Sequence, residues 1–164
     1  MVEIITANTK EHYILIERLG KVVWREHYTS IIGEKQVEYM LNKFQTAKVI
    51  ENQVSQGYHY YIISQNNNPA GYLSIKKDDD TLFLSKFYVL KGFRGQGLGK
   101  AAMQFIETEA KQNNCNKISL TVNKYNTNSI SVYENIGFIN KGNLVVDIGD
   151  GFIMDDYTME KPIN

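Results

Sequence analysis

The stretch that decides the fold is Arg94-Gly95-Gln96-Gly97-Leu98-Gly99-Lys100. An apolar, strand-like run over residues 82–90 precedes it, and a helical pattern over residues 101–110 follows it. Glycines let a backbone approach a phosphate closely, and the unpaired N–H groups of a helix's first turn point at such an anion. Arg94 and Lys100 add positive charge. The stretch therefore predicts a strand, a pyrophosphate-binding turn and a helix, in that order.

The spacing of the glycines excludes two familiar nucleotide-binding loops. A Walker A loop has a glycine, a gap of four residues and then Gly-Lys-Ser/Thr, and this arrangement is absent from the chain. A Rossmann turn needs Gly-x-Gly-x-x-Gly, whereas this chain has Gly95-x-Gly97-x-Gly99. The remaining pattern is Arg-x-x-Gly-x-Gly after a strand. The alternative to an anion-binding loop is a strand-to-helix turn in which the glycines are needed only for the backbone conformation.

A second informative stretch begins about 20 residues downstream. Residues 117–122 alternate and are rich in β-formers, which predicts a strand. Asn126 is a good N-cap, and Gly137 is a natural helix stop, so residues 128–136 are predicted to be helical. Ile130, Tyr133 and Ile136 share one face of that helix.

Together the two stretches resemble the GNAT superfamily of acyl-CoA-dependent N-acyltransferases. The Arg-x-x-Gly-x-Gly loop follows a strand, and Asn126 is followed after seven residues by Tyr133 and then by Gly137-Phe138. The resemblance covers nearly the whole chain. It implies one GNAT N-acetyltransferase domain over residues 1–164, with an α/β fold of mixed sheet. The central sheet is expected to be mostly antiparallel, with one strand-helix-strand crossover and flanking helices.

The coarse pattern of elements has the order that the resemblance implies. It runs strand, three helices, three strands, helix, strand, helix and two strands, with Asp78-Asp79-Asp80 as a solvated hairpin turn. The expected strands are residues 2–7, 58–63, 70–75, 82–90, 117–122, 138–146 and 151–159, with turns at 66–69 and 147–150. The first expected helix starts near Thr9 and ends at Gly33. The second has Val37, Met40, Leu41 and Phe44 on one face, and the third spans 48–56 and ends at Gly57. The last two expected helices span 98–112 and 128–136.

The resemblance also implies the co-substrate, acetyl-CoA, and the residues that hold it. The loop amides would face the pyrophosphate, while the backbone of the preceding strand would pair with the pantetheine arm. Asn126 would bind the arm from the other side. The implied binding residues are Phe87, Tyr88, Val89, Arg94, Gly95, Gln96, Gly97, Leu98, Gly99, Lys100 and Asn126.

The family's usual general acid matches Tyr133, because a phenol with a pKa near 10 can protonate a departing thiolate. Its alternative is a core aromatic on an amphipathic helix. Many relatives carry a glutamate base on the central strand, but residues 84–88 contain no acid. The general base is therefore left open: it could be Glu26, His27, Asp155 or Asp156, or the enzyme could have none. Each of the four residues could instead be a surface charge.

The acceptor implied by the resemblance is a primary amine. Trp24, Glu26, His27 and Tyr28 are predicted to line its pocket, with Asp155 or Asp156 assisting from the last strand, because aromatic faces and carboxylates suit a cationic amine. Glu26 could instead be solvated. A loose similarity to bacterial spermidine/spermine-type acetyltransferases favours a polyamine and direct attack in a ternary complex. The alternatives are a protein N-terminus or lysine as acceptor, or a non-catalytic acyl-CoA sensor.

Composition and charge limit the classes of partner that the protein is expected to bind. The 164 residues are 43% apolar and 22% charged with zero net charge, which favours neither nucleic acid nor a membrane as a partner. Glu3 interrupts the start, so no signal peptide is expected, and Cys115 is a lone cysteine in a polar loop. His12, His27 and His59 lack metal-ligand spacing, so no metal is expected. We expect a cytoplasmic enzyme with a small-molecule amine acceptor, and a homodimer is one option for its assembly. The acyl length stays open.

Overall fold

The computed structural model describes residues 1–164 and contains seven strands, five α-helices and one 3-10 helix. Their order confirms the predicted mixed α/β fold. The strands are β1 (Val2–Thr6), β2 (His59–Gln65), β3 (Asn68–Asp78), β4 (Thr81–Val89), β5 (Lys117–Asn123), β6 (Ile139–Gly149) and β7 (Phe152–Pro162). The helices are α1 (Lys10–Ile32), α2 (Glu34–Phe44), α3 (Ala47–Ser55), η1 (Lys91–Phe93), α4 (Leu98–Gln112) and α5 (Thr127–Asn135).

The strands form one hydrogen-bonded sheet in the order β1-β2-β3-β4-β5-β7-β6. The β4–β5 pair is parallel, and the pairs β1–β2, β2–β3, β5–β7 and β6–β7 are antiparallel. The chain comprises two compact units. The first contains Met1–Lys76 and Lys86–Ile106, and the second contains Lys77–Ser85 and Glu107–Asn164. One domain over residues 1–164 stays a prediction.

Two hairpin turns are shorter than the sequence pattern indicated. Asn66 and Asn67 form one turn, and Asp150 and Gly151 form the other, with β7 starting at Phe152. All four residues have positive φ, which a type I′ two-residue hairpin turn requires at both central positions. The predicted turns at 66–69 and 147–150 were therefore wrong in extent, because these dipeptides alone reverse the chain and the strands continue beyond them.

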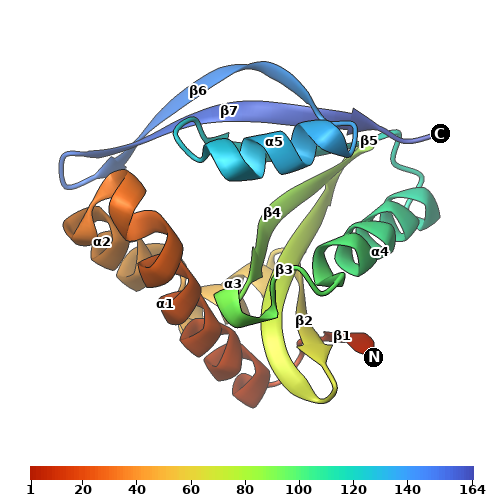
Figure 1. Ribbon diagram of the computed structural model, residues 1–164, viewed down its shortest axis with the longest axis horizontal. Helices are drawn as coiled ribbons and strands as arrows, with labels where there is room; N and C mark the ends of the chain where they lie inside the picture. The colour runs from red at the N-terminus through yellow and green to blue at the C-terminus, as the bar shows by residue number, and fades with distance from the viewer. The chain divides into compact units, whose positions relative to one another are not determined.

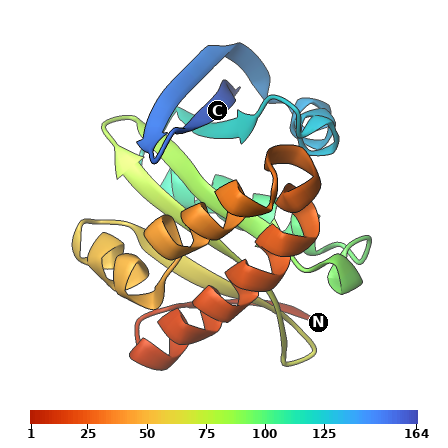
Figure 2. The ribbon, with the colours of Figure 1, turned by 90° about the vertical axis from the view of Figure 1, so that its left-hand side faces the viewer.

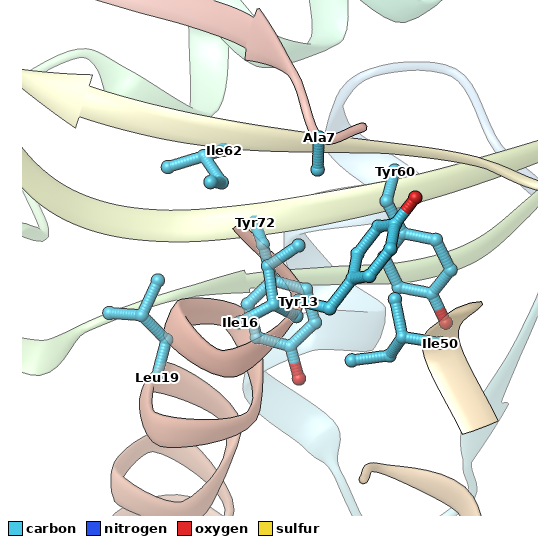
Figure 3. Packing of buried hydrophobic residues seen from close by; sticks show 8 residues of the cluster. All are labelled: Ala7, Tyr13, Ile16, Leu19, Ile50, Tyr60, Ile62 and Tyr72. Atoms are coloured by element: carbon cyan, nitrogen blue, oxygen red, sulfur yellow. The ribbon is translucent and has the colours of Figure 1, made fainter. Parts of the chain in front are cut away.

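In the first unit, α1 to α3 cover one face of the strands (Figure 2). Helix α1 begins where the Thr9 hydroxyl accepts a hydrogen bond from the His12 backbone N–H, and it ends at Gly33, whose φ is 86°. Between helices and strands lies a core in which aromatic and aliphatic side chains interdigitate (Figure 3). Its buried members are Ala7, Tyr13, Ile16, Leu19, Ile50, Tyr60, Ile62 and Tyr72.

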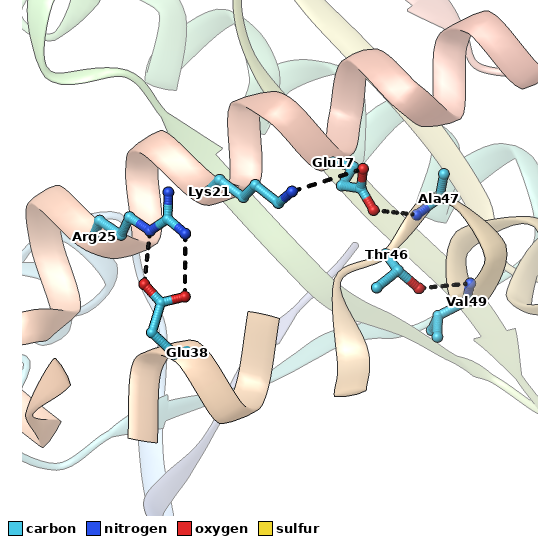
Figure 4. A network of polar contacts seen from close by, with 7 residues as sticks. All are labelled: Glu17, Lys21, Arg25, Glu38, Thr46, Ala47 and Val49. Atoms are coloured by element: carbon cyan, nitrogen blue, oxygen red, sulfur yellow. Dashed lines mark hydrogen bonds and ion pairs between the residues drawn. The ribbon is translucent and has the colours of Figure 1, made fainter. Parts of the chain in front are cut away.

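A polar network on the outside joins these three helices (Figure 4). Arg25 of α1 donates two hydrogen bonds, of 2.8 and 3.1 Å, to the Glu38 carboxylate of α2. Glu17 of α1 accepts a 3.1 Å hydrogen bond from the Ala47 backbone N–H, at the first turn of α3. A carboxylate at a helix N-terminus satisfies an otherwise unpaired N–H group. The network thus links α2 and α3 to α1.

In the second unit, β6 and β7 form a long two-stranded hairpin, drawn in blue in Figure 1. Strand β7 lies between β5 and β6, so both of its edges are paired. Ile118, Leu120, Val122 and Met159 are buried along β5 and β7. Cys115 is also buried, and burial raises the pKa of its thiol. A raised thiol pKa disfavours the reactive thiolate form.

Candidate active site

The glycine-rich loop connects β4 to α4 in the first unit. Gly95 and Gly97 have φ of 76° and 85°, which L-residues with a side chain rarely adopt. No protein atom lies within 4 Å of a Cβ built on Gly95, Gly97 or Gly99, so the loop is open on its outer side. The first helical bond runs from the Ala101 N–H to the Gly97 carbonyl. The N–H groups of residues 98–100 precede that bond and are therefore available to an anion.

The loop is anchored at both ends. The Leu98 side chain is fully buried at the start of α4. The Arg94 Nε donates a 3.2 Å hydrogen bond to the Val89 carbonyl, and the Gln96 side chain donates one of 3.2 Å to the Gly92 carbonyl. Lys100 is exposed. The predicted pyrophosphate loop is thus a fixed turn that carries two cations and presents backbone N–H groups outward.

Strand β4 carries the other predicted binding residues of this unit, Phe87, Tyr88 and Val89, all half-buried. Gly71 of β3 lies against them, since a Cβ at that position would meet the Tyr88 carbonyl oxygen at 2.2 Å. The sequence reasoning missed this glycine. Its isolated place within a strand pattern is a signal of close backbone approach.

Lys86 is a second residue that the sequence reasoning missed. It is 7% exposed, and burial lowers the pKa of its amine to about 7. Its Nζ donates hydrogen bonds to the Tyr60 hydroxyl at 2.6 Å and to the Phe44 carbonyl at 3.2 Å. The alternation of buried Leu82, Leu84 and Lys86 is the signal that could have found it.

Three of the four predicted acceptor residues of α1 form an aromatic cluster with Tyr88. Trp24 and Tyr28 have ring centroids 4.4 Å apart, and the Tyr88 ring lies 5.8 Å from Trp24 and 6.3 Å from Tyr28. The His27 ring is 4.9 Å from that of Tyr28. Trp24 is 5% exposed, whereas Tyr28 and His27 are half-buried. Glu26 is exposed and belongs to no contact of this cluster.

In the second unit, Asn126 precedes α5 as its N-cap, and Tyr133 lies within α5. The Asn126 side chain is buried and caps the helix by accepting a 3.4 Å hydrogen bond from the Ser129 N–H. The predicted N-cap is therefore confirmed. Tyr133 is half-buried, and its ring lies 5.4 Å from that of Phe138.

The two aspartates of β7, Asp155 and Asp156, differ in ion pairing and in burial. Asp155 forms a 2.7 Å ion pair with Lys124. Asp156 is 5% exposed, and burial, together with the charge of Asp155, raises the pKa of its carboxyl to about 6. No group of three or more His, Cys, Asp or Glu side chains is arranged to hold a metal ion. No helix combines the length and apolarity that a membrane span requires.

Solved structures share this fold. The PaiA N-acetyltransferase of Thermoplasma acidophilum, solved in complex with coenzyme A, superposes with a TM-score of 0.83 at 18% identity and covers 99% of both chains. The ribosomal-protein-S18-alanine N-acetyltransferase of Escherichia coli gives 0.75 at 19% identity, covering 100% of this chain and 95% of its own.

The family follows from the sequence. Residues 13–138 match the acetyltransferase (GNAT) family model, so the chain belongs to that family. It is 24% identical over 139 residues to an uncharacterized N-acetyltransferase of Lactobacillus delbrueckii subsp. lactis, a match covering 77% of this chain and 80% of that protein. The protein is therefore an N-acetyltransferase with acetyl-CoA as co-substrate.

Proposed function

We propose that this enzyme transfers the acetyl group of acetyl-CoA to the primary amine of a small molecule, with polyamines as the leading class. The observation that carries this proposal is the aromatic cluster of Trp24, Tyr28 and Tyr88. Electron-rich ring faces attract an alkylammonium group. Tyr28 is half-buried, so part of the cluster reaches the surface.

Lys86 stands on the same strand as Tyr88, two residues before it, and bears on the choice of acceptor. A fully charged lysine would repel a cationic amine. Because burial lowers its pKa to about 7, the residue is largely neutral in mildly alkaline solution. The buried lysine is therefore compatible with a cationic acceptor, and most so above neutral pH.

For the co-substrate, we assign the pyrophosphate to the N–H groups of residues 98–100, with Arg94 and Lys100 as counter-charges. The pantetheine arm is assigned to the backbone of residues 87–89. The ladder of β4 with β5 joins Thr81–Phe83 to Lys117–Ser119, and Leu84 and Ser85 continue β4 beyond it, so part of the β4 backbone lies outside this ladder. Strand backbone outside a ladder is able to pair with an amide-rich arm. Asn126 is assigned to the same arm.

The chemistry is direct attack of the amine on the thioester carbonyl in a ternary complex. An N–C bond forms, the C–S bond breaks, and the Tyr133 hydroxyl gives its proton to the departing thiolate. A tyrosine hydroxyl is a suitable donor because phenols and thiols have similar basicity. The proposal needs no metal.

A thiol-release assay over a panel of amines tests the acceptor class. The panel contains spermidine, a peptide with a free N-terminus, and an N-terminally blocked peptide with one lysine. Turnover with spermidine and with neither peptide is expected. Turnover restricted to a peptide would favour the protein-modifying alternative, for which the fold shared with the S18-alanine enzyme is the supporting observation. Acetyl-CoA binding without any turnover would favour an acyl-CoA sensor.

A further inference from the structure

We propose that Asp156 is the catalytic base, the group that takes the first proton from the acceptor ammonium. This inference rests on the proposed function and adds the proton acceptor that the central strand lacks. Residues 84–88 of β4 contain no carboxylate. The other base candidates of the sequence are Glu26, which is exposed, Asp155, which is paired with Lys124, and His27, whose ring packs edge-on against Tyr28 in the aromatic cluster.

The Asp156 carboxyl is buried but has no hydrogen-bond partner within the protein, so a ligand could supply one. It sits in β7 opposite Asn123 of β5 and Leu144 of β6, and it is 5% exposed. No hydrogen bond or ion pair joins its carboxyl to any other residue. Burial of a carboxylate without hydrogen bonds costs stability. Asp156 therefore contributes little as a structural residue, and an amine bound beside it would supply the missing donor.

The charges around Asp156 suit a base. Its cross-strand neighbours, Asn123 and Leu144, are uncharged. Asp155 is next to it, and that carboxylate is paired with Lys124 at 2.7 Å. Burial is the main cause that raises the pKa of Asp156, to about 6, and the Asp155 charge adds to it. The group is mostly ionised at neutral pH, yet it is a stronger base than an ordinary aspartate.

Asp156 is also tied to the segment that carries the proposed acid. Its neighbour Asn123 ends β5, and the Asn126 N–H donates a 2.9 Å hydrogen bond to the Asn123 carbonyl. Asn126 in turn caps α5, the helix of Tyr133. The Lys124 N–H donates a 3.1 Å hydrogen bond to the Asp155 carbonyl, which fixes this turn to β7. Base and acid thus belong to one hydrogen-bonded segment of the second unit.

The proton balance is complete with these two groups. The ammonium gives one proton to Asp156, which later releases it to water. The neutral amine then forms the N–C bond while the C–S bond breaks, and Tyr133 protonates the sulfur. The second N–H proton of the attacking amine restores the Tyr133 hydroxyl. The products are the acetylated amine, CoA thiol and one proton.

The test is Asp156→Asn, which keeps the size of the side chain and removes its basicity. We expect kcat to fall by about 10²–10⁴-fold, the usual share of general acid–base catalysis, with unchanged Kd for acetyl-CoA by calorimetry. For the wild type, kcat/KM plotted against pH should decrease as the pH falls below about 6. The residual activity of the variant should not show this acidic decrease. Asp150→Asn is the matched control, because Asp150 is an exposed turn aspartate whose φ of 57° asparagine tolerates.

Two results would overturn the assignment: wild-type kcat in Asp156→Asn, or an acidic limb that persists in it. The assay is run with both spermidine and the peptides. Turnover of a peptide alone would refute the small-amine proposal, and the same comparison of variants would then be made with that peptide. A wild-type enzyme without turnover on any amine would refute both proposals.

Discussion

The Nζ of Lys86 donates a 2.6 Å hydrogen bond to the hydroxyl of Tyr60, deep in the first unit. Its other acceptor is the Phe44 carbonyl, while the Tyr60 hydroxyl itself donates to Gln53. An ammonium has three N–H donors, and a neutral amine has two. Two acceptors match the two N–H groups of the neutral form and leave one N–H of the charged form without an acceptor. Burial removes the ammonium from water, and this desolvation lowers the pKa of Lys86 to about 7.

The lysine should make stability depend on pH. The folded-state pKa is lowered to about 7 from an ordinary 10.5, so between these values the unfolded chain binds more protons than the folded one. The free energy of unfolding contributed by Lys86 therefore rises with pH across that window and is lowest below it. Urea denaturation between about pH 6 and pH 9 should show a smaller rise for Lys86→Met than for the wild-type chain.

Lys35→Met, at an exposed position of α2, is the control for this experiment and should keep the wild-type slope. Equal slopes in Lys86→Met and wild type would mean that Lys86 remains charged in the folded chain.

The loop assignment predicts that Gly97→Val weakens acetyl-CoA binding by at least about tenfold, or about 1.4 kcal/mol. Gly97 has φ of 85°, and valine there would strain the backbone and cover the N–H groups that face outward. A Cβ at this position meets no protein atom within 4 Å, so the chain should still fold. Calorimetric titration measures the effect.

Gly92→Ala is a suitable control, since Gly92 lacks a positive φ and has open space around it. A folded Gly97→Val protein with wild-type affinity would place the pyrophosphate elsewhere.

Tyr133→Phe should lower kcat by about 10²–10⁴-fold and leave the Kd for acetyl-CoA nearly unchanged. The substitution keeps the ring that packs 5.4 Å from Phe138 and removes only the hydroxyl. Single-turnover kinetics separate chemistry from product release. A decrease below about threefold would identify Tyr133 as a packing residue and would assign the proton of the thiol to another donor.

For the acceptor, Tyr28→Ala should raise the KM for the amine and leave that for acetyl-CoA unchanged. Tyr28 is half-buried, so its loss should cost little stability. Trp24→Ala is expected to lower the melting temperature as well, because Trp24 is 5% exposed and packs on two tyrosine rings. Glu26→Gln, at an exposed position outside the cluster, should leave both KM values unchanged.

Equal increases of both KM values in Tyr28→Ala would show that the cluster is structural and that the acceptor binds elsewhere.

The sequence by itself determined the order of elements and the positions of most of them. Helix α4 was predicted with its observed bounds, Leu98–Gln112, because a glycine-rich turn and a regular apolar stripe mark both of its ends. The N-cap role of Asn126 was predictable for the same reason, since a cap is a local hydrogen bond between residues three apart. The two motifs, with their spacing, were sufficient to indicate the family.

Tertiary structure alone decided which polar residues are buried and what they face. Lys86 is buried where α2 and β2 supply the Phe44 carbonyl and the Tyr60 hydroxyl as acceptors, and this burial lowers the pKa of its amine. Asp155 and Asp156 are adjacent residues of the same type, yet strand alternation turns their side chains to opposite faces of the sheet. Asp155 pairs with Lys124, whereas Asp156 is buried without a partner. Burial and charge pairing depend on segments distant in the chain, so local pattern could name the two aspartates as candidates but could not rank them, and it did not single out Lys86.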